Sequence, residues 1–264
     1  MTKDNSKSPG QKFETLIAIM ARLRAPDGCP WDREQTHETL RQYLLEEAYE
    51  VLEAIDSGDA HHLQEELGDL LLQTIFHAQI AAERDAFEIS DVVEAISDKL
   101  IRRHPNVFGD VEINSAAEQS VNWEKIKKQE GKSSTIDGVP KALSALLRAW
   151  RIQQKASTVG FDWPETKPVW AKVLEELDEL KEACESENTD NIEEEFGDLM
   201  FSMVNLSRFI NVNPEDALRK TIKKFSQRFK QVEAHFEAAN RNMSEATLQE
   251  MDELWEKAKR QNAR

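Results

Sequence analysis

Two stretches in the second half of the chain decide its fold, VLEELDELKEA at residues 173–183 and EEFGDLMF at residues 194–201. Both have a counterpart 129 positions earlier, LLEEAYEVLEA at residues 44–54 and EELGDLLL at residues 65–72. Each of the four stretches places carboxylates directly against apolar residues. Two matches in the same order and at the same offset indicate an internal repeat.

A third match sets the limits of the repeat. VNWEKIKKQE at residues 121–130 corresponds to ELWEKAKRQN at residues 253–262, at an offset of 132. Residues 131–139, GKSSTIDGV, contain glycine and serine between the copies and are predicted to be a linker. The chain is therefore predicted to be a tandem duplication with copies at 11–130 and 140–264.

Composition and periodicity predict helices in both copies. Nine glycines, eight prolines and two tyrosines are few for a sheet protein of 264 residues. Ala, Leu, Glu, Lys and Gln, which favour helix, dominate long stretches instead. The predicted fold class is all-α, a tandem repeat of two helical bundles. The predicted helices lie at about 13–23, 36–57, 60–84, 90–105 and around Trp123 in the first copy, and at 141–157, 166–187, 190–211, 214–240 and 244–261 in the second.

Several helix ends carry recognisable capping residues. Gly58 is predicted to end one helix and Asp59 to cap the next. In the second copy, Asp190 and Glu193 have the spacing of a capping box, and Pro214 suits a first helical position. These residues predict where the helices turn back on one another.

The charge balance excludes some partners. A net charge of −16 opposes binding to nucleic acid or to anionic membranes. The apolar stretches 70–82 and 199–210 are too short and too interrupted to span a bilayer, and residues 1–10 contain no apolar signal core. Cys29 and Cys184 are 155 positions apart, which makes a disulfide framework or thiolate zinc site improbable. We expect a soluble, cytoplasmic protein.

Four pairs of acids carry the predicted chemistry. Residues three apart share one helix face, and a short connection between two helices favours an antiparallel hairpin. Four carboxylates would then meet at one place, where they repel one another unless a cation lies among them. Oxygen ligands suit Mg²⁺ or Mn²⁺ better than zinc. The pairs are Glu176 with Glu179 and Glu195 with Asp198 in the second copy, and Glu47 with Glu50 and Glu66 with Asp69 in the first.

Simpler explanations account for other acids but not for these. The helix dipole explains Glu193 and Glu194 in a first turn, and a solvated face explains Glu182. Asp198 lies beyond the first turn and enters an apolar run, where a carboxylate is costly unless it is paired or metal-bound. Mid-helix glycine costs roughly 1 kcal/mol relative to alanine. Its recurrence as Gly68 and Gly197 predicts close approach by another group.

A di-iron carboxylate bundle is the main rival for a helical acidic cluster. Such bundles use Glu-x-x-His motifs on two helices. Here Glu34 and His37 form the one Glu-x-x-His motif, beside the CPWD turn and outside the four acid pairs. The sequence therefore disfavours that rival.

Basic and aromatic residues suggest a phosphate-containing substrate. Lys224 and Arg228 lie four apart on one predicted helix, and Lys172 precedes Glu176 by one turn. Such cations could simply form ion pairs, or they could hold a phosphate chain. Trp255, in the repeated WEK motif, is either a core residue or a surface for base stacking. The first-copy counterparts are Lys99, Arg103 and Trp123.

Without a candidate Ser, Cys or His nucleophile, these residues favour attack by water on a phosphoanhydride. A glutamate could accept the proton of that water. Spacing and composition predict metals and a polyanion but do not identify the bond that is cleaved.

The motifs together resemble the MazG family of nucleoside triphosphate pyrophosphohydrolases, in the all-α NTP pyrophosphatase superfamily. The resemblance rests on the acid pairs, GCPWDREQTHETL at 28–40, YLLEEAYEVLEAI at 43–55, IQQKASTVGFDW at 152–163 and the WEK motifs, and it covers nearly the whole chain. It implies Mg²⁺-dependent cleavage of NTPs or dNTPs between the α and β phosphates, giving NMP and pyrophosphate. It also implies a homodimer that clears unwanted nucleotides.

The resemblance also implies a role for each site residue. The metal ligands would be Glu176, Glu179, Glu195 and Asp198, and the nucleotide contacts would be Lys172, Lys224, Arg228 and Trp255. The second copy is expected to be the main catalyst, because Pro105 interrupts the basic helix of the first copy. The first copy would be a weaker site or a dimerisation module. The alternatives are a helical scaffold without catalysis and a di-metal carboxylate protein of other chemistry.

Overall fold

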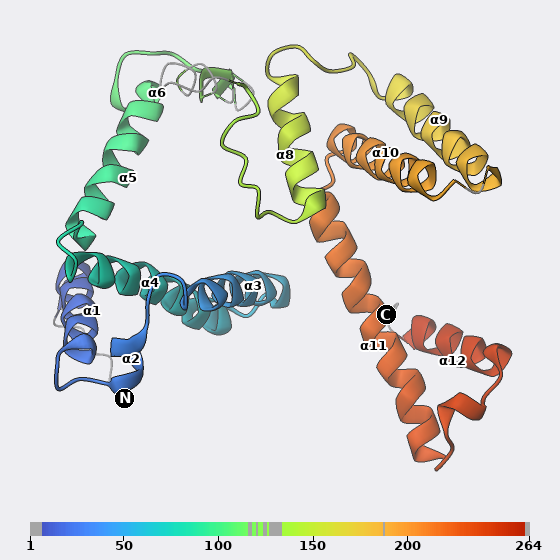
Figure 1. Ribbon diagram of the computed structural model, residues 1–264, viewed down its shortest axis with the longest axis horizontal. Coiled ribbons are helices and arrows are strands. Elements are labelled where there is room, and N and C mark those ends of the chain that lie inside the picture. The colour runs from blue at the N-terminus through green and yellow to red at the C-terminus, as the bar shows by residue number, and fades with distance from the viewer. Residues whose placement is uncertain are drawn as a thin grey trace. The chain divides into compact units, whose positions relative to one another are not determined.

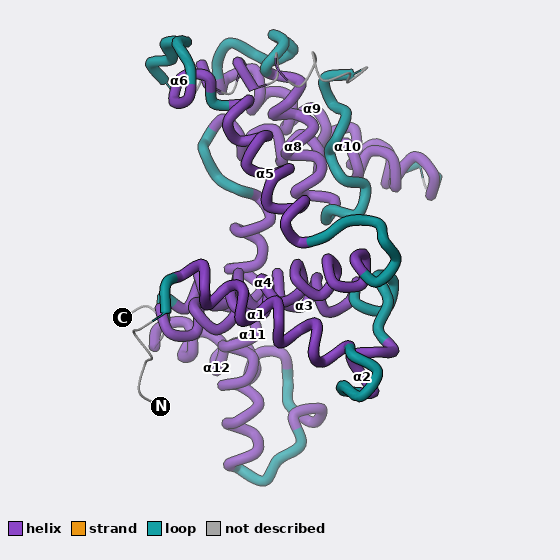
Figure 2. Tube along the Cα trace, turned by 90° about the vertical axis from the view of Figure 1, so that its left-hand side faces the viewer, coloured by secondary structure: helices purple, strands orange, loops and turns teal. Residues whose placement is uncertain are grey.

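The computed structural model describes residues 7–115, 118–119, 121–123, 126, 134–186 and 188–261. Every regular element in these ranges is a helix, as Figure 2 shows. The chain divides into two compact units, Met1–Glu112 and Ile113–Arg264. The predicted all-α class is confirmed, whereas the predicted limits of the copies stay predictions because residues 127–133 lie outside the described ranges.

The first unit is built around an antiparallel pair of helices, α3 and α4. Figure 1 shows α1 beside α4, and α5 leaving the end of α4 at a steep angle. The predicted interruption of the basic helix at Pro105 is confirmed, because α5 ends at Arg103 and Pro105 starts a separate short helix. The elements are α1 (Pro9–Arg24), α2 (Pro30–Glu34), α3 (Arg41–Ser57), α4 (Ala60–Ala82), α5 (Ile89–Arg103) and α6 (Pro105–Phe108).

The core of the first unit lies where α1, the start of α3 and α4 meet. Met20, Leu40 and Ile75 are each 1% exposed and pack together with Phe76 and Ile80. Burial of these apolar side chains at helical spacing explains why the helices associate.

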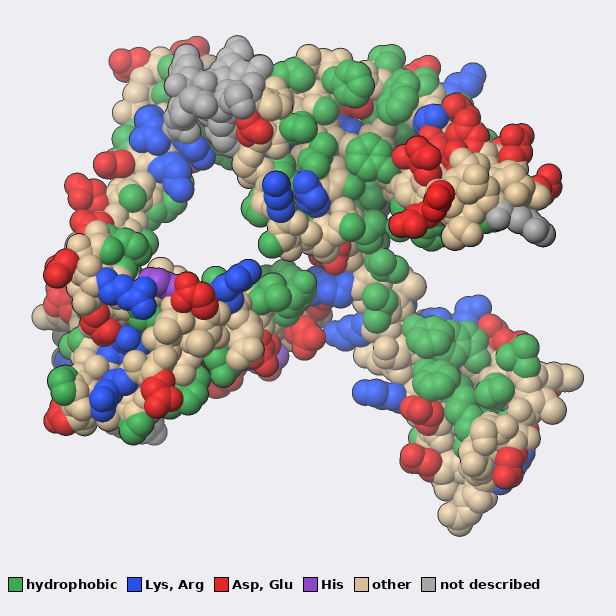
Figure 3. Space-filling model, in the orientation of Figure 1, with side chains coloured by type: hydrophobic (Ala, Val, Ile, Leu, Met, Phe, Trp, Pro, Cys, Tyr) green, Lys and Arg blue, Asp and Glu red, His purple; other side chains and the backbone are tan. Residues whose placement is uncertain are grey.

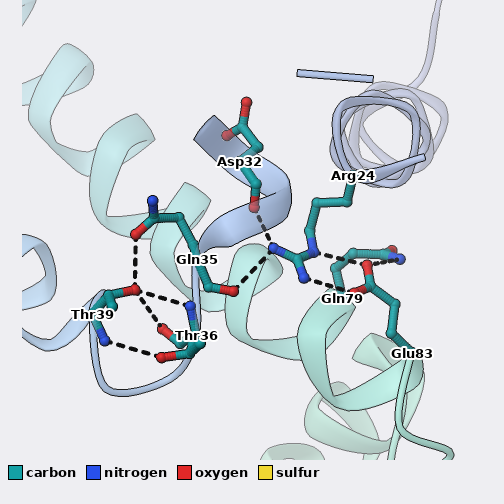
Figure 4. Close-up of polar contacts among 7 residues, drawn as sticks. All are labelled: Arg24, Asp32, Gln35, Thr36, Thr39, Gln79 and Glu83. Carbon is teal, nitrogen blue, oxygen red and sulfur yellow. Dashed lines mark hydrogen bonds and ion pairs between the residues drawn. The ribbon is translucent and has the colours of Figure 1, made fainter. Parts of the chain in front are cut away.

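A buried arginine connects α1 to the end of α4. The guanidinium of Arg24 donates to both carboxylate oxygens of Glu83, with Nη2 2.7 Å from Oε2, and to the carbonyls of Asp32 and Gln35 (Figure 4). These hydrogen bonds lower the pKa of Glu83. The loop before α2 is closely packed, because a Cβ at Gly28 would lie 2.2 Å from the carbonyl oxygen of Leu23. Together these contacts hold the segment that precedes α3.

The second unit contains a longer hairpin of the same kind, formed by α9 and α10. In Figure 1, α8 lies against α10. After α10 the chain forms α11, which pairs with α12. Val169, Val173 and Leu206 form its small core, with Leu199 and Phe209 packed against them. The elements are α8 (Ala145–Ser157), α9 (Thr166–Glu185), α10 (Thr189–Phe209), α11 (Pro214–Ala238), a 3₁₀ turn η1 (Met243–Glu245) and α12 (Leu248–Gln261).

Most predicted helix ends are confirmed, and one is wrong. Gly58 ends α3 with a φ of 71°, Asp59 caps α4, and Pro214 starts α11. The predicted Asp190–Glu193 capping box is wrong, because α10 begins earlier. The Oδ1 atom of Asn188 accepts from the backbone N–H groups of Asp190 and Asn191, so Asp190 falls inside the first turn.

The two repeated glycines do not serve the predicted purpose. A Cβ added to Gly68 or Gly197 would meet no atom within 4 Å among those considered in the described chain. The expectation that they allow close approach by another group is therefore wrong for the chain by itself, because both positions face open space.

The described helices include none with both the length and the apolar content needed to cross a bilayer. Cys29 and Cys184 are both free, as predicted.

Candidate functional site

Three acids of the second unit meet at one place on the α9–α10 hairpin. Glu176 and Glu179 lie one turn apart on α9, and Glu195 lies on α10. One carboxylate oxygen from each lies within 4.8 Å of those of the other two. The antiparallel hairpin produces this arrangement, because it turns a face of each helix toward the other. Figure 3 shows acidic side chains gathered over this hairpin.

The cluster contains one deeply buried carboxylate. Glu176 is 5% exposed, and its Oε1 atom lies 2.6 Å from Nζ of Lys172, one turn earlier on α9. Lys172 also binds Glu175, at 2.8 Å, and hydrogen bonds to the two glutamates raise the pKa of the lysine. Lys172 therefore stays charged and compensates the negative charge of Glu176.

Lys172 does not remove all repulsion among the carboxylates, because Glu179 is still affected by the charge of Glu176. Partial desolvation and the neighbouring charge of Glu176 raise the pKa of the Glu179 carboxyl group. A cation among these oxygens would oppose both effects. The donor set consists of carboxylate oxygens from rigid helices, with no His or Cys in the cluster among the described residues, and it fits Mg²⁺ or Mn²⁺.

Asp198 belongs to the same site but lies at its side. It is not one of the three acids whose oxygens meet, and it lines an adjoining cleft of about 320 Å³ together with Lys172 and Glu176. Residues of α8, α9, α10 and the loop before α9 form the walls of this cleft. The structure thus places a charged cluster at one side of a largely apolar cleft.

The first unit repeats the cluster with a different membership. Oxygens of Glu47, Glu66 and Asp69 lie within 4.8 Å of one another. Burial, followed by the charges of Asp69 and Glu50, raises the pKa of Glu47. Glu50 itself is not among the three acids whose oxygens meet. The Nε2 atom of Gln73 lies 3.5 Å from Glu47 Oε1, so a glutamine side chain reaches into the first cluster.

Other predicted contact residues lie on the α11–α12 pair. The guanidinium of Arg228 lies over the ring of Trp255, with its Cζ atom 5.8 Å from the ring centroid, and Phe225 packs against the same ring. Lys224 is four residues before Arg228 on α11. None of Lys224, Arg228 and Trp255 lines the cleft beside Glu176. Of the four predicted nucleotide contacts, the structure brings Lys172 alone into that cleft.

The first-copy counterparts lie on different elements. Lys99 and Arg103 lie on α5, and Trp123 lies in the short helical segment 121–123. His37 stacks on His77, with their Nδ1 atoms 2.8 Å apart, and it belongs to neither carboxylate cluster.

Sequence reasoning missed the polar residues of the cleft. Gln153 on α8 and Ser202, Asn205 and Arg208 on α10 all line it. The signal was present, because Ser202, Asn205 and Arg208 recur every three residues along the largely apolar segment 199–209. Asp162 forms an ion pair with Arg208 at 2.5 Å and joins the loop before α9 to this face.

These features define a class of protein: a helical-hairpin repeat with an oxygen-only cluster suited to a divalent cation. The sequence model of the MazG nucleotide pyrophosphohydrolase domain matches the chain twice, at residues 35–108 and 166–233. The chain belongs to the MazG family.

Two relatives match almost end to end. The chain is 52% identical over 256 residues to the nucleoside triphosphate pyrophosphohydrolase/pyrophosphatase MazG of Thermotoga maritima. This match covers 96% of this chain and 98% of that protein. It is 45% identical over 257 residues to the nucleoside triphosphate pyrophosphohydrolase of Escherichia coli, covering 95% and 98% respectively.

Proposed function

We propose that this protein hydrolyses nucleoside and deoxynucleoside triphosphates between the α and β phosphates, releasing NMP and pyrophosphate. The observation that carries the proposal is the meeting of Glu176, Glu179 and Glu195 beside an open cleft. Two near-full-length relatives are named for the same activity.

The acids and Lys172 would divide the work of binding and catalysis. Glu176, Glu179 and Glu195 would hold a divalent cation, and Asp198, which lines the adjoining cleft, would complete the ligand set. Bound Mg²⁺ supplies positive charge that stabilises the phosphate oxygens and acidifies water. Lys172 donates to a phosphate oxygen from its place at the cleft. A free carboxylate of the cluster accepts the proton as water attacks the α-phosphorus and pyrophosphate leaves.

We infer that the second unit is the main catalyst. At the repeat offset of 129, Ser202 and Asn205 correspond to Gln73 and Phe76. Gln73 reaches Glu47, and Phe76 is 3% exposed in the core of the first unit. Larger side chains thus occupy the first unit at the positions that line the cleft in the second. Lys224, Arg228 and Trp255 remain proposed nucleotide contacts from the α11–α12 pair.

We further propose that the enzyme is a homodimer acting on the free nucleotide pool of the cytoplasm. Large apolar side chains are exposed on α9, α10 and α11, where a second copy could cover them. They include Leu174, Phe196, Met200, Met203, Ile222 and Phe225.

The proposal is tested by assaying the full chain with each NTP and dNTP and separating the products. We expect pyrophosphate and NMP in the presence of Mg²⁺, and neither product after chelation by EDTA. Release of orthophosphate would point to a different phosphohydrolase. No turnover, combined with unfolding that is insensitive to Mg²⁺, would support the scaffold alternative.

A further inference from the structure

Gln153, one of the residues that line the cleft, contains an unpaired hydrogen-bond acceptor. The residue is 8% exposed, and its Nε2 atom donates to the carbonyl oxygen of Phe201 at 2.9 Å. Its Oε1 atom is also buried and has no hydrogen-bond partner within the described ranges. Because a carbonyl cannot donate, the Phe201 contact fixes the amide orientation, and Oε1 must be the free end. An unsatisfied buried acceptor of this kind calls for a donor from outside the chain.

The position of Gln153 relates this acceptor to the proposed substrate. It lines the same cleft as Lys172, Glu176 and Asp198. The other walls include apolar side chains, among them Ile152, Trp163 and Val169, and Phe161, which is 82% exposed. The cleft therefore combines a charged region for phosphates with an apolar region that contains an isolated polar atom. A nucleotide has the same division, with a charged chain at one end and a planar ring bearing N–H groups at the other.

Asn205 adds a second oriented amide to the cleft. Its Oδ1 atom accepts from Nη1 of Arg208 at 2.5 Å, and Arg208 is held in turn by Asp162. This contact fixes the Asn205 amide so that Nδ2 is its donor end. The cleft thus offers an acceptor from Gln153 and a donor from Asn205, and the edge of a nucleobase presents groups of both kinds.

The comparison of the two units supports a binding role for these amides. At the position of Asn205, the first unit has Phe76, which packs with Met20 and Leu40 in its core. A phenylalanine is therefore compatible with this point of the fold. A buried asparagine there is costly unless its polar groups are used. Packing alone does not explain the asparagine of the second unit.

We propose that Oε1 of Gln153 accepts a hydrogen bond from an N–H group of the substrate's nucleobase, which lies in the apolar part of the cleft. This inference rests on the proposed function and adds a base-recognition residue on α8, outside the two segments that match the family model. Asn205 supplies the complementary donor. The exposed ring of Phe161 provides a surface on which the base can stack.

The test compares natural dNTPs with an abasic deoxynucleoside triphosphate that carries hydrogen in place of the base. Pyrophosphate release in Mg²⁺ gives kcat/KM for each substrate, and the ratio is the value for the natural dNTP divided by the value for the abasic substrate. In Gln153→Leu this ratio should fall by roughly tenfold, the effect of one hydrogen bond, with kcat/KM for the abasic substrate retained. Both substrates are assayed on one preparation, so any unfolded fraction cancels from the ratio.

Gln154→Leu is the matched control, because Gln154 is the next residue on α8 and does not line this cleft. It should leave the ratio unchanged. Gln153→Met, which keeps an unbranched side chain, replaces Gln153→Leu if the leucine variant does not fold. An equal loss for both substrates, or the same change in both glutamine variants, overturns the base contact. Absence of pyrophosphate from the unmodified enzyme with every substrate would instead refute the proposed function itself.

Discussion

Nζ of Lys172 lies 2.6 Å from Oε1 of Glu176, so the most deeply buried acid of the cluster has a cationic partner one turn away on the same helix. The pair explains how a 5% exposed carboxylate is tolerated beside two others. Lys172 is itself partly exposed and lines the cleft, so it can reach both the cluster and a ligand.

Removing this lysine should destabilise the metal-free protein. Lys172→Met leaves Glu176 buried without its partner and should reduce the free energy of unfolding by about 1–3 kcal/mol. Urea unfolding in EDTA measures the loss, and added Mg²⁺ should recover part of it by occupying the cluster. Lys181→Met, which breaks an exposed ion pair with Asp178 on the same helix, should change stability by less than about 1 kcal/mol. Equal effects of the two variants would contradict this account of Lys172.

The two carboxylate clusters should differ in their importance for catalysis. Glu195→Gln should lower kcat/KM for NTPs by about 100-fold or more, because it removes a ligand of the proposed cation. Glu66→Gln, the same substitution at the equivalent position of the first unit, should have little effect. Pyrophosphate release by the full-length variants measures both. Similar losses would show that the first unit also catalyses the reaction.

Transferring the first-unit residue into the cleft should abolish activity without unfolding the protein. In Asn205→Phe the aromatic side chain occupies the cleft as Phe76 occupies the first core, so kcat/KM should fall by about 100-fold or more. Thermal unfolding should occur at or above the temperature of the unmodified protein, because the buried asparagine is replaced by an apolar group. Retained activity would show that the cleft does not hold the substrate.

Alanine substitutions at two glycines should have opposite effects on stability. Gly197→Ala adds a Cβ that meets open space within α10 and should stabilise the protein by up to about 1 kcal/mol. Gly28→Ala adds a Cβ 2.2 Å from a backbone oxygen and should destabilise it by about 1–3 kcal/mol. Denaturant unfolding measures both changes. If Gly197→Ala is stable but inactive, a ligand or a second chain approaches this position.

The Arg24–Glu83 pair should stabilise the first unit in a pH-dependent manner. Because Arg24 lowers the pKa of Glu83, the contribution is present above the unfolded-state pKa and disappears as pH falls through the folded-state value. Glu83→Gln should cost about 1 kcal/mol at pH 7, and the difference from the unmodified protein should vanish as the pH falls through the lowered pKa of Glu83. Glu14→Gln, at an exposed position of α1, is the control. A difference that persists at low pH would indicate a loss of packing instead.

The local features of this fold could be predicted from the sequence. The repeat, the helices and the caps at Gly58 and Asp59 depend on spacing and on residue types that act within a few positions. The same is true of the acid pairs, because a separation of three residues already places two carboxylates on one helix face. The capping box at Asp190 failed for a local reason, since Asn188 caps the helix two residues earlier and Asp190 then lies in the first turn.

Tertiary structure decided which residues share a site. Glu179 meets Glu176 and Glu195 in the second unit, whereas Asp69 meets Glu47 and Glu66 in the first, although both copies contain all four acids. Packing also placed Gln153 of α8 beside Phe201 of α10, residues 48 positions apart in the chain. Periodicity along a helix determines which face a side chain occupies, but only the packing of that face determines what it contacts.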